Sequence, residues 1–339
     1  MIVLDIEDPR WLAFVSASAL ATPFHHPAWA RLLTECYRFS AFALAIEQHG
    51  VIAGGLPVTE VKRPLGARRW VSLPFTDHCA PLVAEGDTEG FLAEATQQAD
   101  RAGIRQIEVH APLEGSGIHL RPEGVIHTLH LSPDPQVVRR SFHKSQVIRN
   151  INRAEKGPIT LRRGDSAPDL TEVYYGLHVR TRRKQGVPVQ SRRFFELLWK
   201  QMLSRGLGFV LLAYAGTTPI AGAVFLAWNG TVTYKYGASN PAYLPLRPNH
   251  LIMWEAIRWS CENGFRTFSF GRSDLDNRGL RDFKSGWGSQ EEELRYSGIG
   301  GDPLGVPMAG MLGALAVVIR HSPLWVTRSL GEILYPFVA

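Results

Sequence analysis

The sequence predicts a mixed α/β (α+β) fold built from two copies of one unit, each a mixed, mostly antiparallel sheet flanked by helices. The chain has 339 residues, the length of about two domains. Hydrophobic residues make up 45% and charged residues 20%, as in ordinary globular proteins. Leu44-Ala45-Ile46 recurs as Leu212-Ala213-Tyr214, and Ile52-Ala53-Gly54 as Ile220-Ala221-Gly222, both shifted by 168 positions (212 − 44). Repetition in the same order indicates a duplicated unit.

The strands are clearest in the second copy. Residues 208–214, 220–228 and 231–236 are rich in β-branched and aromatic side chains, which favour strands. Residues 216–219 form a turn between the first two strands. Asn229-Gly230 is a two-residue hairpin signal because both residues tolerate positive φ. We therefore predict an antiparallel meander of three strands.

A helix and a final strand follow this meander. Asn249 is a suitable N-cap for a helix over residues 250–263, which Gly264 would end. Glu255, Arg258 and Glu262 form one polar stripe on this otherwise apolar helix. Residues 266–270 predict the last strand. Gly103-Ile104-Arg105 echoes Gly264-Phe265-Arg266, which predicts the same helix ending in the first copy.

The predicted organisation is a first unit at residues 1–136, a second at 137–300 and an apolar helical tail at 301–339. The three cysteines are far apart, which argues against a disulfide framework or a zinc site and favours a reducing cytoplasm. The apolar runs are shorter than the ~18 residues of a membrane span. The first residues lack the features of a signal peptide.

Positive charge is concentrated in the middle of the chain. Residues 139–193 contain fourteen Lys or Arg and four acids, a balance of 14 − 4 = +10, and the remainder carries 6 − 10 = −4. This patch favours a polyanion: a nucleic acid, a nucleotide-linked substrate or an anionic membrane. Arg149 and Arg153 would share one helix face, spaced to meet phosphates. The alternative is a solvated basic helix.

Several short motifs lie near the C-terminal end of the second unit, with further ones upstream. They are Phe270-Gly271-Arg272-Ser273, Gly279-Leu280, Phe283-Lys284, Trp287-Gly288 and Leu294-Arg295-Tyr296, with support from Thr181-Arg182, Gly186-Val187-Pro188, Tyr236-Gly237-Ala238-Ser239, Pro248-Asn249, the run from Arg149 to Gly157, Trp29 and the loop from Leu73 to Asp77. These motifs resemble those of FemAB-like proteins and the related BioF2-like GNAT acyltransferases. The resemblance covers about residues 20 to 300 and is most specific in the first group of motifs. A meander followed by a helix and a strand is also the core order of a GNAT unit.

This resemblance implies two tandem GNAT units and transfer of an acyl group to an amine. FemA and FemB ligases move an aminoacyl group from charged tRNA to a peptidoglycan precursor, and other relatives use acyl-CoA. The GNAT pyrophosphate loop needs glycines where phosphate meets backbone N–H groups. The matching run, Arg247-Pro248-Asn249-His250-Leu251, has none. We therefore expect a tRNA-borne or other non-CoA donor.

Lys284 is the predicted catalytic residue. Transfer from an ester to an amine needs an aligned amine, stabilisation of the oxyanion and removal of a proton. Lys284 matches the lysine that the resemblance places at the reacting ester. The alternative is a surface lysine. Phe283 beside it would stack on a donor base or fill the core. The spacing supports neither a Ser-His-Asp nor a Cys-His arrangement, so the amine would lose its proton to the leaving group or to solvent.

The remaining predicted site residues are substrate contacts. Tyr234 and Tyr236 alternate toward one strand face, where they present two hydroxyls or pack in the core. Arg272 and Ser273 follow a strand end, a favourable place for function. Asp77 is expected in an acceptor-binding loop rather than in a triad with His78 and Cys79. The full set of expected substrate-binding residues is Asp77, Arg149, Arg153, Tyr234, Tyr236, Asn249, Arg272, Ser273, Phe283 and Trp287.

The expected function is transfer of an aminoacyl or acyl group to an amine of a peptidoglycan or polysaccharide precursor, in the cytoplasm or at the inner face of the membrane. Charged tRNA or acyl-CoA would be the co-substrate, with no cofactor or metal. Residues 306–339 would either lie at the membrane interface or pack on the second unit. Two alternatives stay open: a CoA-dependent N-acyltransferase, and a non-catalytic protein that binds RNA or membrane through the basic patch.

Overall fold

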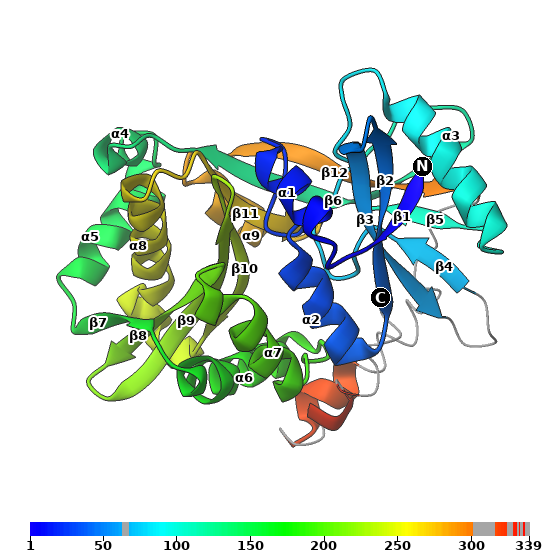
Figure 1. Ribbon diagram of the computed structural model, residues 1–339. Helices are drawn as coiled ribbons and strands as arrows, with labels where there is room; N and C mark the ends of the chain where they lie inside the picture. The colour runs from blue at the N-terminus through cyan, green and yellow to red at the C-terminus, as the bar shows by residue number, and fades with distance from the viewer. Residues whose placement is uncertain (63–67, 301–315, 324–327, 331, 333–334, 336–339) are drawn as a thin grey trace. The chain divides into compact units, whose positions relative to one another are not determined.

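The computed structural model describes residues 1–62, 68–300, 316–323, 328–330, 332 and 335 (Figure 1). The chain divides into two compact units. The first unit contains residues 1–125 and 293–300, and the second contains residues 126–292 with the described C-terminal residues. The sequence instead suggested one boundary after residue 136. The difference arises because the chain returns to the first unit at residue 293.

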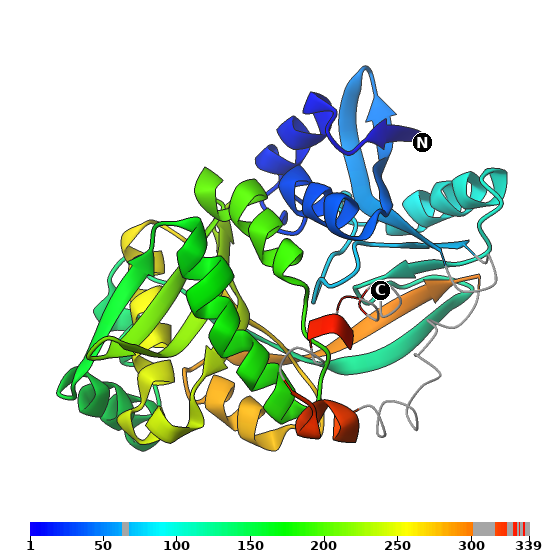
Figure 2. The same cartoon turned by 90° about the horizontal axis from the view of Figure 1, so that it is seen from below.

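The first unit is a sheet with helices on both faces (Figure 2). Its hydrogen-bonded strand order is β1-β2-β3-β4-β5-β12. The β2–β3 hairpin places Leu44 and Leu56 on one face, against Phe91 of α3. On the other face, Gly55 lies directly under the ring of Trp11, where a Cβ would come within 2.7 Å of it. The elements are β1 (Ile2–Asp5), α1 (Pro9–Ala17), α2 (Pro27–Tyr37), β2 (Ser40–Gln48), β3 (Val51–Lys62), β4 (Arg68–Val71), α3 (Thr88–Arg101), β5 (Ile107–Val109) and β12 (Gln290–Ile299).

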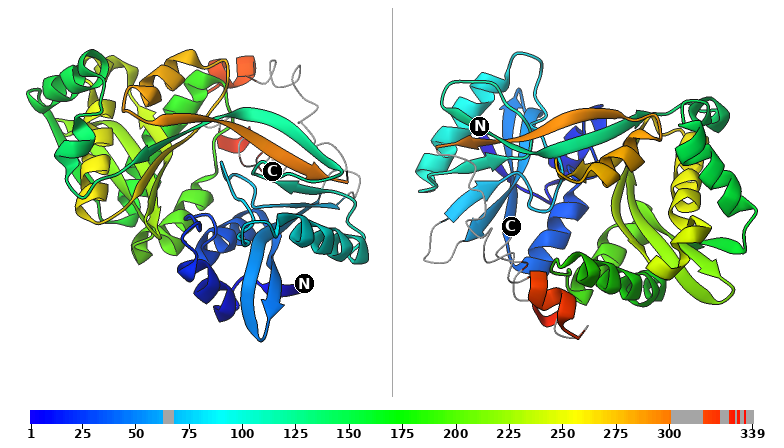
Figure 3. Two further views of the ribbon diagram at one scale, coloured as in Figure 1. Left: turned by 90° about the horizontal axis from the view of Figure 1, so that it is seen from above. Right: turned by 180° about the vertical axis from the view of Figure 1, so that it is seen from behind.

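The second unit has the same order of hairpin, third strand, helix and final strand, but more helices and strands precede its first hairpin. Its strand order is β6-β11-β10-β9-β8-β7, where β6 contributes residues 126–130 and its earlier residues belong to the first unit. The helices α5 and α8 cover one face, and α6 and α7 cover the other (Figures 1 and 3). The elements are β6 (Ile118–His130), α4 (Pro135–Arg139), η2 (Lys144–Ile148), α5 (Arg149–Glu155), β7 (Ile159–Gly164), η3 (Asp169–Tyr174), α6 (Tyr175–Gln185), α7 (Arg192–Gln201), η4 (Leu203–Arg205), β8 (Gly208–Ala215), β9 (Thr218–Trp228), β10 (Thr231–Ser239), η5 (Pro241–Leu246), α8 (Pro248–Glu262), β11 (Thr267–Ser273) and α9 (Arg278–Ser285).

The predicted duplication is confirmed by the topology. In each unit an antiparallel hairpin leads to a third antiparallel strand, then a helix, then a strand parallel to the third: β2-β3-β4-α3-β5 and β8-β9-β10-α8-β11. The Asn229-Gly230 turn has positive φ at both residues, 50° and 77°. Gly103 and Gly264 follow the equivalent helices with φ of 69° and 75°. These turns and helix ends follow from local chemistry.

The predicted N-cap of α8 was wrong. The helix begins at Pro248, and Arg247 is its N-cap in a left-handed conformation with φ 66°. Asn249 lies inside the first turn and donates from Nδ2 to Ser239 Oγ at 3.5 Å. Proline suits the first helical position because its φ is already helical and it has no N–H to leave unpaired. This proline therefore moves the helix start two residues ahead of the predicted 250.

The described parts of the C-terminal segment pack on the second unit. Arg320 donates to the carbonyl of Gln185 at 3.2 Å, and Arg182 donates to the hydroxyl of Tyr335 at 3.1 Å. These contacts agree with packing against the second unit, while the apolar residues 306–315 lie outside the described residues. No helix among the residues described is both long and apolar enough to cross a membrane.

Candidate functional site

A hollow of about 300 Å³ opens in the second unit at the start of α8. Strands β9 and β10, the first turn of α8 and the helix α9 supply its walls. Three predicted site residues meet there, from parts of the chain up to fifty positions apart. The lining residues are Gly222, Ala223, Tyr234, Asn249, Ile252, Met253, Gly279, Leu280 and Phe283. Most of this surface is apolar, with polar groups at Tyr234 and Asn249, as in sites for small ligands.

Tyr234 and Tyr236 lie on opposite faces of β10, so the predicted shared face was wrong. Tyr234 pairs with Phe225 and Tyr236 with Val224, and Lys235 is the extra residue of a bulge between them. A bulge shifts the alternation of side chains by one position. Tyr234 faces the hollow, and burial raises its pKa to about 12. Tyr236 instead packs against His178, Phe194 and Phe195.

Lys284 is almost fully buried, with 2% of its surface exposed, so it is not a surface lysine. Its ammonium donates to the carbonyls of Gly271 and Arg272, each at 2.8 Å. Gly271 adopts a positive φ of 68°, which turns the end of β11 toward α9. Burying an ammonium is costly unless it is hydrogen-bonded. The structure thus holds a positive charge next to Phe283, on the helix that walls the hollow.

The other motif residues near Lys284 have different surroundings. Phe283 meets the ring of His250 edge to face, with ring centroids 5.3 Å apart. Trp287 has no exposed surface and lies in the core against Phe142, rather than on the wall of the hollow. Arg272 is exposed and pairs with Asp274 at 2.8 Å. Ser273 is buried, and its hydroxyl has no partner within the described chain.

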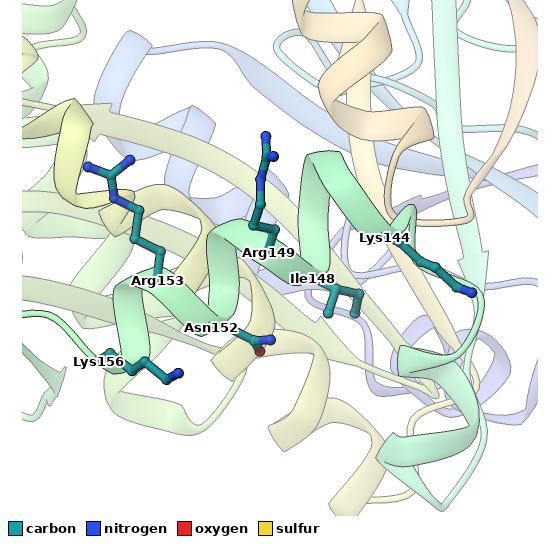
Figure 4. Close-up of a pocket in the computed structure, with 6 residues that line it drawn as sticks. All are labelled: Lys144, Ile148, Arg149, Asn152, Arg153 and Lys156. Atoms are coloured by element: carbon teal, nitrogen blue, oxygen red, sulfur yellow. The ribbon is translucent and has the colours of Figure 1, made fainter.

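A basic hollow of about 400 Å³ lies along η2 and α5 (Figure 4). Arg149 and Arg153 extend from the same side of α5, as their spacing predicted. None of the cations in this hollow makes an ion pair with a described residue. Its lining residues are Lys144, Ile148, Arg149, Asn152, Arg153 and Lys156.

Part of the predicted patch is used internally. Arg139 pairs with Glu155, Arg162 with Asp169, and Arg192 with Glu172 and Glu196. Arg163 lies over the rings of Phe209 and Trp259. Since paired cations offer less to a partner, these four of the fourteen Lys and Arg residues contribute less to an attraction for polyanions than the cations of the basic hollow do.

His250 connects the basic hollow to the hollow beside α8, a role that sequence reasoning did not predict. Its Nε2 donates to the carbonyl of Gln146 in η2 at 3.2 Å, while its ring packs on Phe283. Burial, then the charge of Arg247, lowers its pKa to about 4, so the ring is neutral. One neutral side chain thus contacts both the wall of the hollow and the helix that carries the cations.

Asp77 lies in the first unit, in a strained loop. Leu73 and Phe75 both have positive φ, 57° and 62°, although neither is glycine. Such backbone persists only where surrounding contacts impose it, and it often marks a functional loop. Here Tyr296 donates its hydroxyl to the carbonyls of Thr76 and Asp77, both at 3.2 Å.

Comparisons of sequence and structure show which known proteins this chain is similar to. Residues 141–285 match the family model of the acetyltransferase (GNAT) domain. The lipid II:glycine glycyltransferase of Staphylococcus epidermidis is 32% identical over 80 residues, which cover 22% of this chain and 19% of that protein. The chain thus spans about a fifth of the length of that curated relative.

Two solved structures share the fold over most of the chain. The crystal structure of FemX has a TM-score of 0.72 at 15% identity and covers 88% of this chain and 97% of its own. A tandem GNAT protein from the clavulanic acid biosynthesis pathway has a TM-score of 0.56 at 12% identity, covering 89% and 99%. The predicted tandem GNAT fold and the resemblance to FemAB-like proteins are confirmed.

Proposed function

We propose that this chain, which is similar to the acetyltransferase (GNAT) domain over residues 141–285 and to FemX in fold, is an acyltransferase which moves an aminoacyl or acyl group to an amine of a cell-envelope precursor. The observation that carries the proposal is the hollow of about 300 Å³ walled by α9, the helix in which Lys284 is buried. A related protein is named a glycyltransferase acting on lipid II. From this name we take over only the class of acceptor, an amine of a cell-envelope precursor.

In the proposed reaction the acceptor amine attacks the carbonyl carbon of the donor ester. A C–N bond forms, and the carbonyl oxygen becomes a transient oxyanion. The C–O ester bond then breaks, and the leaving hydroxyl takes the proton that the amine loses. The fixed ammonium of Lys284 stabilises the oxyanion by its charge, an effect worth several kcal/mol in a water-poor site (~3 kcal/mol for one such group).

We propose charged tRNA as the donor. The basic hollow around Arg149 and Arg153 provides unpaired cations for phosphates. His250 connects it to the wall of the hollow beside α8. Phe283 would stack on the terminal base. Arg247 and Pro248 occupy the turn where a CoA pyrophosphate would need glycine N–H groups. The acceptor would be bound with help from the loop that carries Asp77.

Titration calorimetry with coenzyme A separates the two donors. We expect no binding in the micromolar range. Micromolar affinity would contradict the tRNA proposal and support the second candidate, a CoA-dependent N-acyltransferase, which the match to an acetyltransferase domain favours.

Transfer itself is tested by incubating the protein with tRNA charged with radiolabelled amino acids and with an envelope precursor that carries a free amine. We expect label to move to the acceptor with the wild type and not with Lys284→Met. Equal RNA binding without transfer by either protein would instead support a non-catalytic RNA-binding role.

A further inference from the structure

Helix α9 is attached to the sheet mainly by polar groups. Lys284 is its only buried residue in the structure described. Leu280 and Phe283, its large apolar residues, are half-buried and face the hollow. Phe283 packs against Trp287 of the core, and because Lys284 is held by hydrogen bonds, the orientation of the helix depends on specific hydrogen bonds as well as on this packing.

A second set of polar contacts anchors α9 through His127 of β6, a residue with no exposed surface. Its Nε2 lies 3.0 Å from Glu291 Oε2 and 3.3 Å from Ser285 Oγ. Glu291 in turn accepts two hydrogen bonds from Arg281 of α9, at 3.0 and 2.7 Å. Arg281 also donates to the carbonyl of Leu275 at 2.8 Å. The chain His127–Glu291–Arg281 therefore links β6, β12 and α9.

The protonation of His127 follows from these contacts. A carboxylate only accepts hydrogen bonds, so the proton of the ring is on Nε2 and points at Glu291. Burial, and then the charge of Lys284, lowers the pKa of His127. Its Nδ1 is buried without a partner among the described residues. A buried polar atom left unsatisfied costs stability, so this histidine is poorly explained as simple core filling.

We propose that His127 is a positioning residue that holds α9, and with it Phe283 and Lys284, in place through its Nε2 contacts to Glu291 and Ser285. The catalytic consequence rests on the proposed function, whereas the anchoring of α9 does not. His127 would not touch the substrate. Its loss would let α9 move and misplace the ammonium, which lowers the rate of the chemical step more than binding.

The test compares His127→Ala, His127→Gln and Arg281→Gln with the wild type. Glutamine can keep an N–H donor near the position of Nε2. Arg258→Gln is the matched control, because Arg258 also pairs with glutamates, at 2.7 and 3.3 Å, but on the helix α8. Hydrogen exchange of the amides of residues 278–286 reports the anchoring of α9, and kcat and KM report catalysis.

We expect His127→Ala and Arg281→Gln to speed exchange in α9 and lower kcat, each by about tenfold or more, as for loss of a hydrogen bond to a charged group. KM for the acceptor should stay within about twofold. With His127→Gln, exchange in α9 and kcat should both return most of the way to the wild-type values. Arg258→Gln should change neither quantity. If His127→Ala does not fold, Arg281→Gln decides whether these contacts anchor α9, because Arg281 lies at the partly exposed end of the chain of contacts.

Unchanged exchange in α9 in both His127→Ala and Arg281→Gln would overturn the proposal. So would a His127→Gln protein that has normal exchange but no activity, since that would make Nδ1 the functional atom. If the wild type transfers no acyl group from any donor, the proposed function fails, but the exchange comparison still decides whether His127 anchors α9.

Discussion

The two units share one topology and differ in the connection that follows the third strand of each meander. In the second unit, β10 carries a bulge and α8 begins abruptly at Pro248, which leaves a hollow of about 300 Å³. In the first unit, β4 is followed by the strained loop from Leu73 to Asp77, which runs over a buried ion cluster. The same framework is formed twice, and the two units differ in the segments that follow it, which are the parts of a fold that vary most.

The ion cluster of the first unit is buried. Glu108 contacts Arg69 at 3.1 Å and His110 at 3.2 Å, and all three are at most 7% exposed. His110 stacks on Tyr296 with ring centroids 4.0 Å apart and contacts Thr76. Buried polar atoms without a partner in the described chain occur in both units, at Thr59 Oγ1 in the first and at His127 Nδ1 and Ser273 Oγ in the second. We infer that the ion cluster stabilises the first unit.

The largest expected effect is at Lys284. Lys284→Met should lower kcat roughly 100- to 1,000-fold, because the charge beside the reacting carbonyl is lost while the buried volume is kept. Steady-state transfer assays measure this. Lys62→Met, at the exposed end of β3 in the first unit, is the control and should leave kcat unchanged. A kcat within twofold of the wild type would show that Lys284 takes no part in the reaction. It would also contradict the assignment of the reaction to the second unit.

The second effect concerns the stability of the first unit. Glu108→Gln should lower the free energy of unfolding by about 3 kcal/mol, because a buried guanidinium loses its carboxylate. Urea denaturation measures it. The control is Glu60→Gln, whose partner Arg68 is exposed, with an expected loss below about 1 kcal/mol. Equal losses at the two sites would contradict the inference that the ion cluster stabilises the first unit.

The third effect is a loss of stability in acid. Burial lowers the pKa of His178 to about 3 and that of His25 to about 4. Unfolded histidine titrates near 6.5, so between that pH and the folded pKa the unfolded state binds more protons. Stability is therefore full above about pH 6.5 and falls as the pH drops, by about 2 kcal/mol per buried histidine at pH 5.

Denaturation at pH 7 and pH 5 tests this pH dependence. His178→Phe in the second unit should reduce the difference between the two pH values by about 2 kcal/mol. The exposed His130 is the control, and His130→Phe should leave the difference unchanged. If His178→Phe keeps the whole acid loss, the burial of this histidine is not its source.

The smallest effect is on RNA affinity. Replacing Arg149 and Arg153 by glutamine should weaken tRNA binding about tenfold at moderate salt and reduce the slope of log affinity against log salt by about 2. Arg192→Gln is the control, since Arg192 lies in the same basic stretch but pairs with Glu172. Similar losses in both variants would mean that the whole stretch, rather than the hollow in Figure 4, attracts RNA.

Much of the fold was predictable because its signals are local. The Asn229-Gly230 turn, the helix end at Gly264 and the repeated hairpins all depend on a few neighbouring residues. The stripe on α8 was also predictable, since Arg258 pairs with Glu255 and Glu262 three and four positions away. The roles of the predicted site residues stay predictions, although Tyr234, Asn249 and Phe283 do line one hollow.

The wrong predictions concern a bulge, a proline and a buried side chain, which the periodicity of strands and helices does not reveal. The bulge at Lys235 reversed the direction of Tyr236, and the proline at 248 replaced Asn249 as the start of α8. Trp287 was expected at the substrate but lies in the core. The burial of Trp287 depends on packing against residues that are distant in sequence, whereas the helix start at Pro248 follows from the local geometry of proline.

The amino-acid sequence by itself determined the duplicated framework, because hydrophobic periodicity and turn residues act over a few positions. Only the tertiary structure decided which charges are available. It paired Arg139, Arg162 and Arg192 with acidic residues, buried Lys284, and brought His127 to Glu291, which lies more than 160 positions away (291 − 127 = 164). The free energy of a charge depends on the solvent and partners around it, and these are set only when the chain has folded.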